Sequence, residues 1–181
     1  MFKKEFLSHL LFVVIWLFII TLLCWSWHLN LIWLWLGGLV GAFLLDIDHL
    51  IYFLVANPHE LTSQRVKRLF DQRRFKEALF LMAETRLERP KLALHNALFQ
   101  IILITLAFFV LTSTNNLFGA GLVMGLALHL LKDEFQDLIN NEEHLRTWLF
   151  WQFKFEVSLQ GQKIYLAIMV LLFLSLNWLL I

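Results

Sequence analysis

The chain has 181 residues, of which 60% are hydrophobic and only 16% are charged, and its formal net charge is +1. Soluble domains average about a quarter charged residues, so this composition excludes an ordinary water-soluble protein, a disordered chain and a disulfide scaffold. The small net charge does not indicate a nucleic-acid partner, and the single cysteine, Cys24, excludes an internal disulfide.

Long apolar segments follow one another along the chain, and each approaches the ~20 residues that a membrane-spanning helix needs. The segments cover about 6–25, 31–56, 94–111, 117–131 and 164–181. The first is too long for a signal peptide and lacks a small-residue cleavage site, so we expect it to be retained. The sequence predicts an all-α, polytopic membrane helix bundle of about five transmembrane helices, in one integral membrane domain over residues 1–181.

The basic residues indicate the orientation of these segments. Nine of the 15 lysines and arginines lie between Glu60 and Lys91, and the turns at 26–30 and 112–116 have none. Five spans place every basic residue, including Lys3 and Lys4, on the same side, which the positive-inside rule makes cytoplasmic. We therefore expect a cytoplasmic N-terminus and a C-terminus on the outer side.

Two segments are expected at the cytoplasmic surface. The first is a basic loop at 57–92, in which apolar residues from Phe75 to Leu87 recur at helical spacing. This helix either lies on anionic lipid headgroups or covers the inner end of the bundle. The second, at 140–162, has aromatic residues such as Trp148 interrupted by charges, which is typical of an interfacial helix. The expected partners are the bilayer and its anionic lipids, with no nucleic acid.

Ionisable residues lie near the cytoplasmic ends of four apolar segments, where burial is costly and usually marks function. His9 follows Lys4 by five residues, and His95 follows Lys91 by four. On the second and fourth segments the corresponding residues are Asp46, Asp48, His49, His129 and Asp133. Their common depth predicts that they meet in one pocket.

The spacing of small residues indicates which way these groups face. One stripe of the fourth segment has i, i+4 spacing and consists of Gly121, Gly125, His129 and Asp133. A similar stripe on the second segment consists of Gly38, Ala42, Asp46 and His49. Small residues mark close helix contacts, so both stripes should face the bundle interior. Asp48 points nearly the opposite way from Asp46 on a regular helix, and joins the pocket only if the helix unwinds or Asp48 turns to a neighbouring segment.

Clustered imidazoles and carboxylates are typical of divalent metal sites, with zinc the first expectation and manganese or iron the alternatives. The expected ligands are His9, Asp46, His95, His129 and Asp133, and the expected catalytic residues are Asp48 and His49, as base or as supporting groups. His9 and His95 as plain interfacial residues, and a simple His49–Asp46 pair, are the alternative interpretations.

These motifs resemble the YdjM-like family of bacterial inner-membrane metal-dependent hydrolases. The matching positions are His9, Leu45-Asp46-Ile47-Asp48-His49, Leu94-His95-Asn96 and the segment from Gly125 to Asp133. The resemblance covers about residues 5–135. Leu45 stands where the family has proline, and Lys132 stands where it has an apolar residue. The resemblance implies location in a bacterial inner membrane and metal-dependent hydrolysis.

The leading functional hypothesis is a membrane-embedded hydrolase at the cytoplasmic leaflet, acting on a phosphoester or lipid phosphate. A bound metal ion can turn water into a nucleophile at neutral pH. Ion or proton transport is an alternative, although it requires polar groups toward the outer face, where the segments are almost purely apolar. A non-catalytic membrane partner protein is the third hypothesis.

Overall fold

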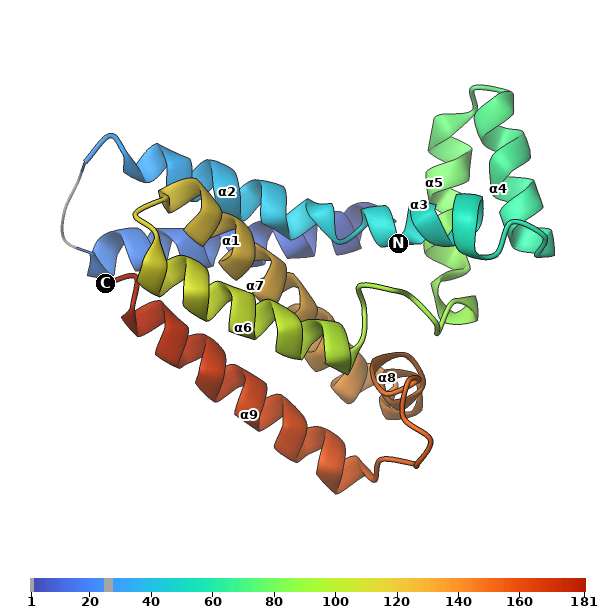
Figure 1. Cartoon of the computed structure of the whole chain (residues 1–181). Coiled ribbons are helices and arrows are strands. Elements are labelled where there is room, and N and C mark those ends of the chain that lie inside the picture. Colours follow the sequence, from blue (N-terminus) through green and yellow to red (C-terminus); the bar gives the residue numbers. More distant parts are fainter. Residues whose placement is uncertain (1, 25–27) are drawn as a thin grey trace.

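The computed structural model describes residues 2–24 and 28–181, with the side chains of residues 2–6 left aside, and these residues form helices and no strand (Figure 1). The charges of Lys3 and Lys4 therefore lie outside the described side chains. Five long helices form the body of the molecule: α1 (Phe2–Leu23), α2 (Leu31–Leu44), α6 (Ala97–Ser113), α7 (Leu117–Asn140) and α9 (Leu159–Trp178). Helix α7 contacts each of the other four, so it is the central helix.

Shorter helices gather at the end of the body where α1 begins (Figure 1). They are α3 (Ile47–Ile51), the π-helix η1 (Tyr52–Ala56), α4 (Leu61–Asp71), α5 (Phe75–Glu84), the 3₁₀-helix η2 (Arg86–Glu88) and α8 (Glu142–Leu149). The C-terminus lies at the opposite end of the body.

Several helices begin at a polar residue whose side chain accepts a hydrogen bond from a backbone N–H of the first turn. Asn96 accepts from Phe99 N at 2.9 Å at the start of α6, and Asn116 accepts from Gly119 N at 3.1 Å at the start of α7. Asn141 caps α8 in the same way and Ser158 caps α9. These caps satisfy N–H groups that the helix itself leaves unpaired.

Helices α2 and α7 pack backbone to backbone through glycines. A Cβ atom on Gly37 or Gly41 would collide with the α7 backbone, and a Cβ atom on Gly121 or Gly125 would collide with the α2 backbone. Only glycine permits this approach. The structure thus confirms that the small residues of both segments face the bundle interior. On α2, the glycines that face α7 are Gly37 and Gly41, whereas a Cβ atom on the predicted Gly38 would meet side chains of α1. The contact leads directly to Ala42 and His129.

The second predicted segment is interrupted where its acidic residues lie. The backbone N–H groups of Asp46, Asp48 and His49 bond to the carbonyl three residues earlier, at 2.9–3.2 Å. Each residue then advances by about 120° instead of 100°, which reduces the angular separation of Asp46 and Asp48 from about 160° to about 120°. This local tightening, without a proline, directs Asp48 toward the 92–95 segment.

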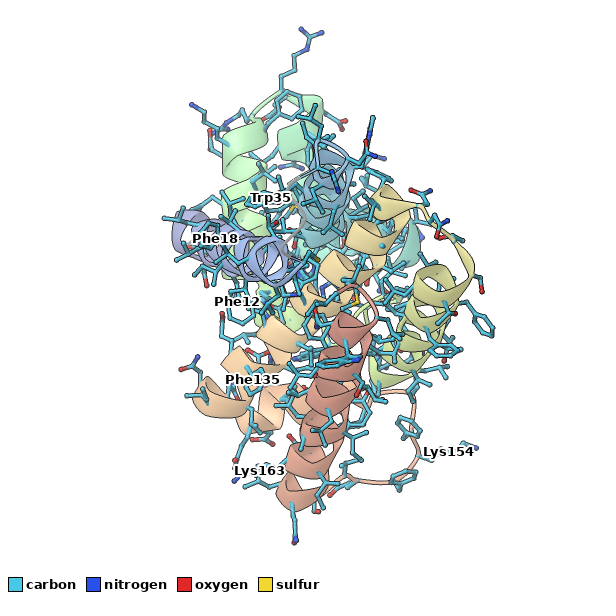
Figure 2. The ribbon with its side chains drawn as sticks, turned by 90° about the vertical axis from the view of Figure 1, so that its left-hand side faces the viewer. Phe12, Phe18, Trp35, Phe135, Lys154 and Lys163 are labelled. Carbon is cyan, nitrogen blue, oxygen red and sulfur yellow. The ribbon has the colours of Figure 1, made fainter. Side chains whose placement is uncertain are left out.

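The outer surface of the body is apolar. Among the exposed large side chains are Phe12 and Phe18 of α1, which Figure 2 shows on its outward side, together with Leu106 of α6 and Leu171 of α9. Two helical stretches are long and apolar enough to cross a membrane, Leu31–Ala56 and Leu159–Trp178. Stretches Leu7–Leu23 and Ala97–Ser113 are apolar but shorter, so length and composition mark two such helices among the described residues, compared with the five expected.

The two predicted surface segments pack onto the body more closely than expected. In the 57–92 loop the predicted helix is α5, and a second helix that no sequence pattern predicted, α4, packs beside it. Within 140–162 the separate helix is α8, since residues 159–162 already belong to α9, and Trp148 of α8 is buried with Leu145 and Leu149 against Ala97. The stretch between α8 and α9 contains no helix, so most of the predicted interfacial helix is absent there.

Candidate metal centre

Three buried side chains from α1 and α7 come together as a group that can hold a metal ion. One ligand atom each of His9, His129 and Asp133 lies within 4.8 Å of the other two. His9 Nε2 is 2.9 Å from Asp133 Oδ1, and the imidazole rings of His9 and His129 stack with their centres 4.3 Å apart. These distances confirm that the first and fourth segments bring their ionisable residues together.

The hydrogen bond of His129 determines which of its nitrogens faces the group. Its Nδ1 lies in a close hydrogen bond with the carbonyl oxygen of Ala42, which can only accept, so Nδ1 carries a hydrogen. In the neutral ring, Nε2 then presents a lone pair to Asp133 Oδ2 at 3.4 Å and to Asp46 Oδ1 at 3.9 Å. A lone pair facing two carboxylates is stabilised by a proton or a metal ion between them. Ligand atoms in a tetrahedral zinc site are roughly 3.4 Å apart, which the observed separations approach.

Asp48 and His95 form a second oriented pair. Asp48 is 1% exposed, and its carboxylate accepts hydrogen bonds from Leu94 N at 2.6 Å and Ala93 N at 3.3 Å. His95 Nδ1 is 3.2 Å from Asp48 Oδ2, which leaves the buried His95 Nε2 without a hydrogen-bond partner. A carboxylate that holds the other nitrogen of a histidine is the usual support of a metal ligand.

The four histidines predicted for the site form a continuous row. Beyond the His9–His129 stack, the ring centres of His129 and His95 are 5.8 Å apart, and those of His95 and His49 are 5.2 Å apart. Residues from four predicted segments therefore meet at one end of the body, as their common depth indicated. Asp46 lies at the edge of the row, with its side chain 51% exposed.

Two cations that the sequence analysis did not assign to the site approach it closely. Lys132 Nζ is 3.2 Å from His9 Nδ1 and 3.6 Å from Asp133 Oδ1. Because an ammonium group only donates, His9 Nδ1 accepts and His9 Nε2 carries the hydrogen that is donated to Asp133. An ion bound by His9 Nε2 must displace this proton. Arg86 is the second cation, 3.6 Å from Asp133 Oδ2.

Asp137 anchors Arg86 one helical turn beyond Asp133. Its Oδ2 accepts from Trp148 Nε1 at 2.7 Å and lies 2.9 Å from His144 Nδ1 and 3.5 Å from Arg86. Helix α8 and η2 are thus joined to α7 beside the metal-binding group. The i, i+4 spacing of Asp133 and Asp137 was visible in the sequence, but their shared arginine was not.

A cavity of about 300 Å³ opens beside these groups. One part of its wall is polar, with His9, Asp46, His49 and Asp133, and the rest is apolar or cationic: Phe43, Ile47, Leu50, Leu79, Met82, Ala83, Arg86 and Arg89. Helix α5 therefore covers the end of the body that holds the histidines, and covering an end of the bundle is one of the two roles expected for it.

Arg89 is a buried cation of the cavity wall. It lies 4.5 Å from the centre of the Phe53 ring and donates to Met82 O at 2.6 Å. Burial lowers the pKa of Arg89 to about 10, so its guanidinium stays charged at neutral pH. The cavity therefore combines metal-ligating side chains, positive charge and an apolar wall.

No family model, curated protein or solved structure matches the chain. The observation that bears directly on the function is the buried group of His9, His129 and Asp133, whose geometry suits a metal ion.

Proposed function

We propose that the chain is a multi-pass protein of a bacterial inner membrane, with its five long helices crossing the bilayer and α3, α4, α5 and α8 at the cytoplasmic face. The apolar outer surface of α1, α2, α6 and α9 supports this arrangement, since lipid is the solvent in which such side chains are stable. The basic residues of the 57–92 loop support the cytoplasmic assignment and an attraction to anionic lipids.

Within this membrane protein we propose a metal-dependent hydrolase of the YdjM-like type. The observation that carries the proposal is the orientation of His129, whose Nδ1 is fixed by a backbone carbonyl and whose Nε2 faces two carboxylates. His9, His129 and Asp133 fit a divalent ion, zinc first, and Asp46 and His95 lie next to this group. When bound, the ion supplies a Lewis acid and activates water.

The chain's own residues orient these ligands and receive the substrate. Asp48 is occupied by two backbone N–H groups and His95, so we assign it to positioning His95 rather than to proton transfer. His49 lines the cavity with an unpartnered Nδ1. Arg86 and Arg89 suit an anionic head, and Phe43, Leu50 and Leu79 suit a hydrocarbon chain. A lipid phosphate combines both features.

The test compares the wild-type protein with the His129→Ala/Asp133→Ala double variant and with His59→Ala, an exposed-histidine control. We expect bound zinc in the wild type and the control, measured by mass spectrometry of the purified protein, and at least tenfold less in the double variant. Release of inorganic phosphate from phosphatidic acid or an isoprenoid monophosphate in mixed micelles should follow the metal content. Equal, negligible metal in all three proteins would overturn the proposal.

A further inference from the structure

A single ion at His9, His129 and Asp133 would leave two nearby buried nitrogen atoms without a ligand or a hydrogen-bond partner. His95 Nε2 and His49 Nδ1 have no hydrogen-bond partner, although both atoms are shielded from solvent. Leaving a buried polar atom unsatisfied costs about 1–3 kcal/mol, so two such atoms at one place call for a ligand.

One ion cannot reach the whole row of histidines. Two atoms bound at about 2.1 Å to the same ion are at most about 4.2 Å apart. Among the described residues, His9, His129 and Asp133 form the one group of three whose ligand atoms all lie within 4.8 Å. His95 is the next ring along and His49 follows it, so these two lie beyond the reach of that ion.

The spacing of His49 and His95 suits an ion of their own. Two imidazoles on one tetrahedral ion have ring centres roughly 5 Å apart, since each centre lies about 3.2 Å from the metal. The observed separation of these two rings is 5.2 Å. Asp48 fixes His95 so that its Nε2 is the available atom.

Asp46 can connect the two positions. Its Oδ1 lies 3.9 Å from His129 Nε2, and the residue lines the cavity together with His49. In two-metal hydrolytic sites the ions are about 3.5–4 Å apart, a separation that one carboxylate can bridge. As the described side chains stand, Asp46, His49 and His95 do not form a group of three within 4.8 Å, so the half-exposed Asp46 side chain must rotate to place one oxygen on each ion.

We propose that the site is dinuclear: a second divalent ion binds His49 Nδ1, His95 Nε2 and Asp46, beside a first ion at His9, His129 and Asp133. This inference rests on the proposed metal centre and extends it. With Arg86 and Arg89 in its wall, the cavity favours a dianionic head such as a phosphomonoester over a neutral ester.

The test counts the ions bound to the 181-residue chain in detergent. Wild type, His49→Ala and the exposed-histidine control His28→Ala are equilibrated with Zn²⁺ and freed of excess by gel filtration. We expect about two ions per chain in the wild type and the control, and about one in His49→Ala. Loading the wild type with Mn²⁺ should give the electron paramagnetic resonance spectrum of an exchange-coupled pair, a measurement that needs no substitution.

The outcomes separate this inference from the hydrolase proposal. One ion per chain in the wild type, unchanged in His49→Ala and with an uncoupled Mn²⁺ spectrum, overturns the second site and leaves the mononuclear hydrolase intact. Two ions in both the wild type and His49→Ala overturns the assigned ligand. A wild type without bound metal overturns both proposals.

Discussion

Lys132 provides the sharpest test of the electrostatics of the site. Its ammonium group lies 3.2 Å from His9 Nδ1 and 3.6 Å from Asp133 Oδ1, where it neutralises a carboxylate that a metal ion would otherwise neutralise. It also fixes His9 in the tautomer whose Nε2 is protonated. Lysine and a metal ion therefore compete for the same two residues, and Lys132→Met, which preserves much of the side-chain volume, should bind metal more tightly.

The size of the effect follows from these separations. An ion beside His9 and Asp133 would lie about 5 Å from the ammonium group, where two unit charges repel by about 3 kcal/mol at an effective dielectric constant of 20. A divalent ion doubles this figure. Much of the repulsion disappears because the flexible lysine side chain swings away, and we expect a residual gain of about 1.4–2.7 kcal/mol, a roughly 10- to 100-fold lower Kd for Zn²⁺.

Competition with a chromogenic chelator measures the Kd directly, and thermal unfolding provides a second readout. Without metal, Lys132→Met should be less stable than the wild type, because Asp133 loses a partner. With saturating Zn²⁺, its gain in Tm should exceed that of the wild type. Lys163→Met is the matched control, since Lys163 is exposed at the start of α9 and points away from the body in Figure 2.

An unchanged or higher Kd in a folded Lys132→Met protein would refute the competition. It would mean that Lys132 supports metal binding, for example by holding Asp133 in place. A similar fall in Kd for Lys163→Met would instead attribute the effect to overall charge.

Three further predictions concern the framework. Gly125→Ala should lower the free energy of unfolding by about 1–3 kcal/mol in a detergent denaturation assay, because its Cβ atom would meet a backbone carbonyl of α2. Gly119→Ala is the control and should be neutral, since no atom lies nearer than 3.5 Å to the added Cβ atom. Asp48→Asn should weaken zinc binding about 10- to 100-fold by misorienting His95; unchanged affinity would contradict the supporting role. Trp16→Phe removes a 2.7 Å hydrogen bond to α9 and should cost about 1 kcal/mol in the same denaturation assay.

That these side chains would come together was predictable from the sequence. It depended only on how far each residue lies from the basic end of its apolar segment and on which face of the helix it occupies. His9, His95 and His129 each lie a few residues inside the basic end of an apolar segment, so any bundle of these segments brings them to one level. The glycine spacing before His129 then predicted that it faces the bundle interior. Residue type and spacing determine both properties, and the structure confirms them.

Other features depended on information that a linear pattern lacks. The tightened turn at Asp46 has no proline or glycine to announce it, so the position of Asp48 was left open. Helix α4 is polar on most of its surface and forms through packing on α5 and η1. The approach of Lys132 to His9 depends on how a long, flexible side chain folds back, which spacing alone does not determine.

The glycine contact between α2 and α7 also determines which substitutions leave the position of the His129 ring unchanged. With backbones touching at Gly37, Gly41, Gly121 and Gly125, neither helix can slide along the other without a collision. The backbone contact between α2 and α7 therefore determines the distance from the Ala42 carbonyl to the His129 ring. In the membrane that we propose for this chain, apolar side chains on the outer surface can therefore be exchanged, and the bilayer thickness can change, without altering the orientation of the imidazole.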